Sequence, residues 1–121
     1  MAKKIFIIDG NDLMIEVMTY ILKSNGYEVI SYHDGNNIFN DIKINHPDLI
    51  IIDSFLSGLN GKEICTLIKL NRDTKRLPVI ICSDIEDIDY LPTQKGAPND
   101  VLHKPFNIAS LIEKVEFQLV A

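Results

Sequence analysis

The sequence has no excess of positive charge. Its 121 residues include 12 Lys and Arg against 17 Asp and Glu, which gives a formal net charge of -5 and a pI near 5.0. A nucleic-acid surface needs clustered Lys and Arg side chains to displace counterions from phosphates. We therefore expect no direct nucleic-acid binding.

Long apolar runs are missing as well. After Lys3 and Lys4, the apolar stretch covers only residues 5–8 before Asp9 interrupts it. That length is far too short for a signal peptide or a membrane span. We expect no contact with a membrane and a cytoplasmic location.

Cysteine is scarce, and linker-like, repetitive or low-complexity stretches are absent. Cys65 and Cys82 have no spacing that would make a disulfide framework or a metal knuckle. Hydrophobic residues make up 46% and charged residues 24% of the chain, which is an ordinary globular balance. Residues 1–121 are therefore expected to form one domain with two reduced, buried thiols.

Short apolar runs that stop at a polar residue are the main pattern. Runs of this kind cannot face water on either side, so they are typical of central strands in a parallel sheet. The carboxyl ends of such strands gather ligand-binding groups in one crevice, although an acid there can also merely cap a strand and a lysine can merely cover the sheet edge. The runs are residues 5–8 ending at Asp9, 49–52 ending at Asp53, 79–82 ending at Ser83, and 101–102, which continues through His103 to Lys104.

Apolar residues recur at helical spacing between these runs. The first helix is expected to begin at Asn11 or Asp12 and to end at Gly26, with Leu13 and Val17 on its apolar stripe. Strands alternating with helices predict a parallel sheet covered on both faces. The other segments are a half-exposed strand over 27–32, helices around 38–42, 64–68 and 108–119, a helix end before Pro47, and a loop over 54–61.

Residues 84–95 fit the alternation poorly. A helix is expected here, but the segment holds four acids by Asp89 and then Pro92. Proline inside a helix removes a hydrogen-bond donor and clashes with the preceding turn. The fourth helix should therefore be short or irregular.

Taken together, these segments resemble the receiver domain of bacterial response regulators, the CheY-like module of two-component signalling. The resemblance covers the entire chain and implies a doubly wound α/β fold with five parallel strands in the order 2-1-3-4-5. The matching pieces are Ile7-Ile8-Asp9, the run from Pro47 to Asp53, Gly58-Leu59-Asn60-Gly61, the run from Leu77 to Ser83, and His103-Lys104-Pro105-Phe106.

The resemblance implies that Asp53 is a phosphoacceptor, supplied by a sensor histidine kinase, a phosphotransfer protein or a small phosphodonor. Lys104 would contact the phosphoryl oxygens as a point charge, and Ser83 would hydrogen-bond one of them. The Lys104-Pro105 bond would be the cis-proline turn of the family. No enzymatic turnover is expected beyond self-phosphorylation and slow self-dephosphorylation.

The metal site implied by the resemblance lacks one acid. Magnesium would be held by Asp9, Asp53 and the backbone carbonyl of Phe55, but Gly10 stands where receivers commonly carry a second acid that binds the metal directly. Loss of that ligand should weaken Mg²⁺ binding. Asp12 is an alternative ligand if the turn before it folds inward; otherwise it caps the first helix.

Three further departures lie on the side that usually reports phosphorylation. Val101 has no aromatic ring to move between surface and interior, Asp84 places a charge after Ser83, and Ser57 replaces a usual proline. Like charge beside an incoming phosphoryl group would oppose its arrival or retention. These departures favour a remodelled output face.

Two functions follow as hypotheses. The first is a stand-alone receiver, a monomer or weak dimer, that signals to a downstream effector protein through phosphorylation-dependent contacts. The second is a degenerate receiver that acts as a phosphorylation-independent interaction module. A phosphate-ester hydrolase using Asp9 is disfavoured because Asn11 replaces the required acid, and a flavodoxin-like cofactor binder because residues 9–12 lack a phosphate-binding loop pattern.

Overall fold

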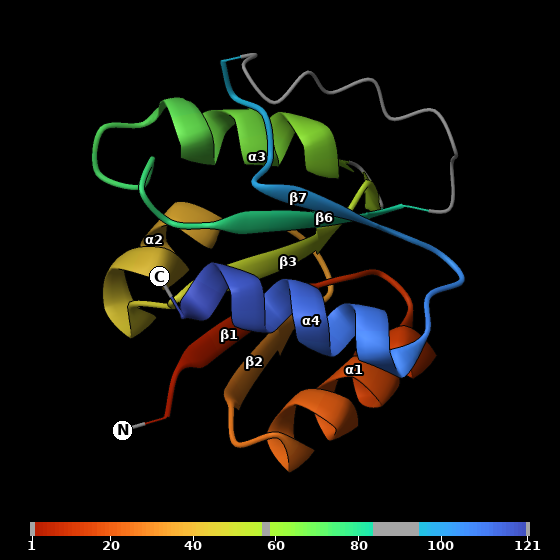
Figure 1. Cartoon of the computed structure of the whole chain (residues 1–121). Helices are drawn as coiled ribbons and strands as arrows, with labels where there is room; N and C mark the ends of the chain where they lie inside the picture. The colour runs from red at the N-terminus through yellow and green to blue at the C-terminus, as the bar shows by residue number, and fades with distance from the viewer. Residues whose placement is uncertain (1, 57–58, 84–94, 121) are drawn as a thin grey trace.

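Five parallel strands form the centre of the molecule (Figure 1). The computed structural model describes residues 2–56, 59–83 and 95–120. The strands lie in the order β2-β1-β3-β6-β7, which confirms the predicted order once the short strands β4 and β5 are set aside. Their bounds are β1 Lys4–Ile8, β2 Glu28–Tyr32, β3 Leu49–Asp53, β6 Val79–Ser83 and β7 Asp100–His103.

Helices cover both faces of this sheet, as the alternation of strands and helices predicts (Figure 1). Successive side chains of a strand point to opposite faces. In β1, Ile5 and Ile7 therefore pack against one pair of helices, while Phe6 and Ile8 pack against the other pair. The first pair is α1 Asp12–Ser24 and α4 Ile108–Leu119, and the second is α2 Ile38–Asn45 and α3 Gly61–Leu70.

Asparagine side chains cap the N-termini of three helices. Asn11, Asn60 and Asn107 each accept a hydrogen bond from a backbone N–H in the first turn of α1, α3 and α4 respectively, which satisfies a donor that has no partner within the helix. Helix α2 ends at Asn45, ahead of Pro47 as predicted. No helix in the described part of the chain has both the length and the apolar character needed to cross a membrane.

The predicted buried face of α1 is wrong in part. Leu13 is 68% exposed and Val17 is 42% exposed, while Ile15 is buried instead. The helix carries more apolar residues than one face can bury, so periodicity alone does not decide which stripe meets the sheet. Leu67 in α3 and Ile108 in α4 are likewise exposed, although their spacing predicts a place on apolar stripes.

The segment after Asp53 is not the simple loop that was predicted. Phe55–Leu56 and Leu59–Asn60 form the two short antiparallel strands β4 and β5, and Gly61 is already the first residue of α3. Two-residue strands carry no periodicity from which they could be predicted. Ser57, which departs from the family pattern, lies outside the described residues.

The predicted short or irregular fourth helix also lies outside the described residues. Those residues stop at Ser83 and resume at Lys95, so Asp84, Asp89 and Pro92 are not described. The described chain continues through 95–99 into β7.

Cys65 and Cys82 are buried free thiols, as predicted. Burial raises the pKa of each thiol to about 12, because a thiolate would lose its hydration. Both side chains therefore act as small apolar residues of the core near neutral pH.

Gly61 allows α3 to approach the end of β3. Its backbone N–H donates to the carbonyl oxygen of Ser54 at 3.0 Å, and a Cβ atom at this position would overlap the carbonyl oxygen of Asp53. A helix that begins so close to the strand end therefore needs a residue without a side chain. In contrast, a Cβ at Gly10 would meet no atom of the described residues within 4 Å.

We expect Gly61→Ala to destabilise the fold by about 2 kcal/mol or more, because α3 must move away from β3. Urea unfolding followed by circular dichroism measures the free energy of unfolding. Gly10→Ala is the matched control and should change stability by less than about 0.5 kcal/mol. Equal stabilities of the two variants would contradict the role assigned to Gly61.

Candidate functional site

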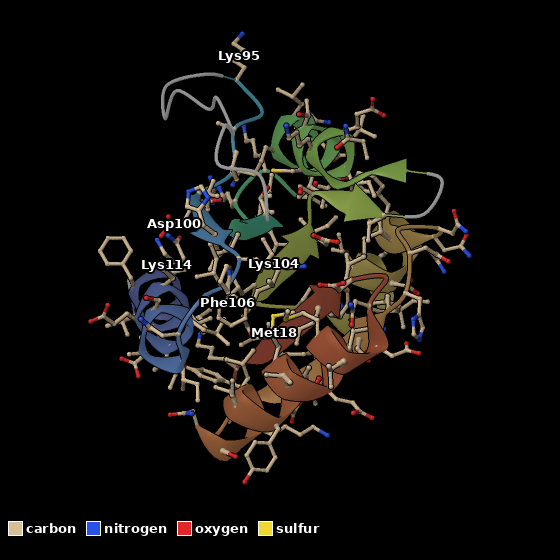
Figure 2. The ribbon with its side chains drawn as sticks, turned by 90° about the vertical axis from the view of Figure 1, so that its right-hand side faces the viewer. Met18, Lys95, Asp100, Lys104, Phe106 and Lys114 are labelled. Atoms are coloured by element: carbon tan, nitrogen blue, oxygen red, sulfur yellow. The ribbon has the colours of Figure 1, made fainter. Side chains whose placement is uncertain are left out.

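Three charged side chains meet where the strands end. Asp9 follows β1, Asp53 is the last residue of β3, and Lys104 follows β7. Ile8 pairs with Ile52, so Asp9 lies level with Asp53 on the neighbouring strand. All three charged residues continue the strand positions that face α1 and α4. Figure 2 shows Lys104 near the ends of β1 and β3.

Lys104 joins the two carboxylates. Its Nζ lies 3.3 Å from Oδ2 of Asp9 and 3.3 Å from Oδ1 of Asp53, and it donates a hydrogen bond to each. The side chains are 15% exposed for Lys104, 1% for Asp9 and 13% for Asp53. One ammonium thus lies within hydrogen-bonding distance of two largely buried carboxylates.

Asp9 is held in place on both sides. Its Oδ1 accepts a hydrogen bond from the backbone N–H of Asn11 at 2.9 Å, while its Oδ2 accepts from Lys104. Its own backbone N–H donates to the carbonyl oxygen of Tyr32 on β2. The carboxylate is therefore fixed before any ligand arrives.

The surroundings of Lys104 favour its charged form. Burial lowers the pKa of the ammonium, but the carboxylates of Asp9 and Asp53 and the hydrogen bond to Asp53 together outweigh burial and raise it above the ordinary value of 10.5. Lys104 is therefore a permanent cation near neutral pH, placed against Asp53. The peptide bond between Lys104 and Pro105 is cis, as the family resemblance implied.

Ser83 lies at the end of β6, on the other face of the sheet. It is fully buried, and its Oγ accepts a hydrogen bond from the Oγ of Ser54 at 3.3 Å. Ser54 was not among the predicted site residues. The sequence could have indicated Ser54, because it follows Ile50 and Ile52 at every second position. This spacing places its polar side chain on the same buried face as those two residues.

Asp12 is not brought together with the other acids. It begins α1, its side chain is 82% exposed, and its Oδ1 lies 3.1 Å from Nδ1 of His33. Within the residues that the structure describes, no three His, Cys, Asp or Glu side chains are grouped so that they could hold a metal ion. Of the predicted ligands, Asp9 and Asp53 are brought together by Lys104, and Phe55 follows Asp53 by two residues as the first residue of β4.

This smaller set still suits magnesium. Mg²⁺ in proteins is commonly held by one or two carboxylates, with water and substrate phosphate completing its shell. Two carboxylates and one carbonyl meet that need, although Lys104 already neutralises part of their charge. Asp9, Asp53 and Phe55 would hold the ion more weakly than a set with a further acid.

The family of the chain follows from comparisons with known proteins. The family model described as the response regulator receiver domain matches residues 5–116. The chain belongs to this family. Receiver domains act in two-component signalling, where phosphorylation of an aspartate is the general role and Mg²⁺ typically binds in the site. They are generally signalling modules rather than enzymes.

Solved structures share the whole fold. A protein described as a response regulator from Chloroflexus aurantiacus is 29% identical with a TM-score of 0.90, and each chain is covered to 100%. The receiver domain of a histidine kinase from Syntrophus aciditrophicus is 25% identical with a TM-score of 0.88, over 98% of this chain and 91% of that one. A receiver domain of a sensor histidine kinase from Pseudomonas aeruginosa, with magnesium coordinated in its active-site cleft, is 23% identical with a TM-score of 0.82 and full coverage of both chains.

We expect Gly10→Asp to tighten Mg²⁺ binding by about tenfold, because it adds a carboxylate where a new side chain meets no obstacle. Isothermal titration calorimetry without any phosphodonor measures the dissociation constant. Gly10→Asn is the matched control: it has the same shape without the charge and should gain much less. An unchanged affinity in Gly10→Asp would show that Gly10 does not limit metal binding.

We expect Lys104→Gln to lower the free energy of unfolding at pH 7 by about 3 kcal/mol, since it leaves two buried carboxylates without their cation. The raised pKa of Lys104 sets the pH dependence. The stabilisation is complete below about pH 10.5 and is lost as the pH rises through the folded-state pKa. Urea unfolding of both proteins at pH 7 and pH 11 should show a smaller difference at pH 11.

The matched control for this prediction is Lys114→Gln. Lys114 pairs with Asp100 at 3.0 Å, but both side chains are 32% exposed (Figure 2). Its loss should cost about 1 kcal/mol or less. A similar cost for both lysines would contradict the central role of Lys104.

Proposed function

We propose that Asp53 accepts a phosphoryl group from a sensor histidine kinase or a phosphotransfer protein. The contact of Lys104 with Asp53, at 3.3 Å, is the observation that carries this proposal. A carboxylate oxygen of Asp53 attacks phosphorus, a P–O bond forms, and the bond from phosphorus to the donor nitrogen breaks with its electron pair leaving on the donor. The product is an acyl phosphate.

The neighbours of Asp53 match the needs of this transfer. Charge develops on the oxygens of the transferring group, and catalysis consists mainly in positioning the reactants and neutralising that charge. Lys104 supplies a fixed positive charge, and the Ser83 hydroxyl supplies a hydrogen-bond donor. Magnesium held by Asp9, Asp53 and the Phe55 carbonyl would supply further positive charge.

The phosphorylated chain would act through contacts with a downstream effector protein. Because Val101 in β7 is aliphatic, the signal would not depend on the movement of an aromatic ring at this position. The chain would work in the cytoplasm as a monomer or weak dimer, without contacting nucleic acid or a membrane.

The alternative is a degenerate receiver that binds partners without phosphorylation. The open space at Gly10 favours this alternative, because a metal ligand is missing there and the remaining carboxylates already share Lys104. Such a module would present the same surface whether or not a phosphodonor is present.

Phosphorylation separates the two functions. With acetyl phosphate and excess Mg²⁺, we expect intact-protein mass spectrometry to show one added phosphoryl group, located at Asp53 by borohydride reduction and peptide mapping. Asp53→Asn is the matched control and should remain unmodified. If the wild-type chain gains no phosphoryl group and its spectra do not respond to beryllofluoride, the chain is a degenerate receiver.

A further inference from the structure

We infer that the groove between the end of α2 and the turn after α3 is a docking site for an acidic peptide segment of a partner protein, with an apolar side chain of that segment seated in the groove. Helix α2 leads into the start of β3, and the turn leads into the start of β6, so the groove lies at the amino ends of the strands. Asp53 lies at their carboxyl ends. The inference therefore goes beyond the proposed function and holds for the chain without a phosphoryl group.

The groove has a volume of about 400 Å³ and two walls. One wall is formed by Phe39, Ile42 and Lys43 of α2 with His46 after it, and the other by the turn of residues 71–74. Helices α2 and α3 cover the same face of the sheet, and the turn follows α3 (Figure 1). Ile42 is buried and Phe39 is half-buried. The α2 wall therefore offers an apolar surface on which an aliphatic or aromatic side chain can pack.

The turn that forms the second wall is held in shape by hydrogen bonds within the chain. The carbonyl oxygen of Asn71 accepts from the backbone N–H of Thr74 at 3.1 Å and from that of Lys75 at 2.8 Å. Its Oδ1 accepts from the backbone N–H of Asp73 at 2.8 Å. Thr74 is buried, and its Oγ1 donates to the carbonyl oxygen of Ile68 in α3 at 2.7 Å. The groove is therefore preformed, which lowers the entropic cost of binding.

Exposed cations belong to both walls of the groove. Lys43 lies on the α2 wall, and the turn and its continuation carry Lys75 and both arginines of the chain, Arg72 and Arg76. Among the described residues, no acid forms an ion pair with any of these side chains. Asp73 is the one acid in residues 71–76. The groove therefore has a positive rim on a chain whose formal net charge is -5.

This charge distribution fits a partner that carries carboxylates. Guanidinium groups bind carboxylates through two parallel hydrogen bonds, and arginine is enriched in protein interfaces. The acidic remainder of the chain repels an acidic segment, while the cations of the rim attract it, so the segment is steered to the groove. The acids of the segment would then pair with the rim, and an apolar side chain between them would pack against Phe39 and Ile42.

A nucleic acid fits this groove less well than an acidic peptide. Nucleic-acid binding gains its affinity from many phosphate contacts along an extended basic surface. The net charge of -5 repels a long polyanion, and the rim offers only a few exposed cations. The apolar α2 wall has no phosphate to bind, whereas it suits the side chain of a peptide.

The test uses the unphosphorylated full chain and a fluorescein-labelled peptide in which Asp and Glu residues flank a central Leu-Phe pair. Fluorescence anisotropy at low ionic strength measures the dissociation constant. We expect Arg72→Glu to weaken binding by about tenfold or more. The matched control is Lys23→Glu, an equal charge change at an exposed position of α1 on the other face of the sheet, and it should weaken binding by less than about twofold. A peptide with Ser-Ser in place of Leu-Phe should bind about tenfold more weakly, because it leaves the apolar wall uncovered.

Asp73→Asn gives a comparison that damage to the fold cannot imitate. Asp73 lines the groove, and loss of its charge should tighten binding of the acidic peptide by about two- to fivefold, because a like charge no longer opposes the segment. Unchanged or weaker binding in Asp73→Asn, equal losses in Arg72→Glu and Lys23→Glu, or no binding by the wild-type chain would overturn the inference. An oligonucleotide of equal charge that binds the wild-type chain as tightly as the peptide does would also overturn it, in favour of a nucleic-acid site.

Discussion

The bridge from Lys104 to two carboxylates is the interaction on which the site depends. Asp9 and Asp53 lie level on neighbouring strands and are largely removed from water, an arrangement in which two anions repel each other and lose their hydration. One ammonium within 3.3 Å of both makes the arrangement stable. The same contact raises the pKa of Lys104 and keeps a fixed positive charge beside Asp53. The stability of this cluster and the proposed phosphoryl transfer would thus depend on the same side chain.

The pleat of the sheet divides the site into two halves. Positions that continue the α1 and α4 face carry Asp9, Asp53 and Lys104, and the next positions of β3 and β6 carry the hydroxyls of Ser54 and Ser83 on the other face. Charges and neutral donors are therefore separated by strand alternation rather than by long loops. Asp53, the proposed phosphoacceptor, lies at the border of these halves, where both kinds of donor would reach a group attached to it.

The sequence predicted the parts of this arrangement that depend on strong apolar runs. The strand ends at Asp9, Asp53 and Ser83 were expected because a short apolar run that stops at a polar residue is typical of a buried parallel strand. The exposed face of α1 was not predicted, because the sequence does not show which of its two apolar stripes meets the sheet. The short strands β4 and β5 were not predicted either, because each is only two residues long. Ser54 was missed because a serine after a strand is ordinary until its partner on another strand is known.

The absence of an acid at Gly10 affects the charge balance of the whole site. A further acid at this position would add a third carboxylate to the cluster, and one lysine could then compensate a smaller share of the negative charge. Without that acid, Lys104 pairs with only two carboxylates, and we expect this cluster to attract a metal ion less strongly. A phosphoryl group on Asp53 would bring its own negative charge into this environment. Its stabilisation would then depend more heavily on Lys104 and on the Ser83 hydroxyl.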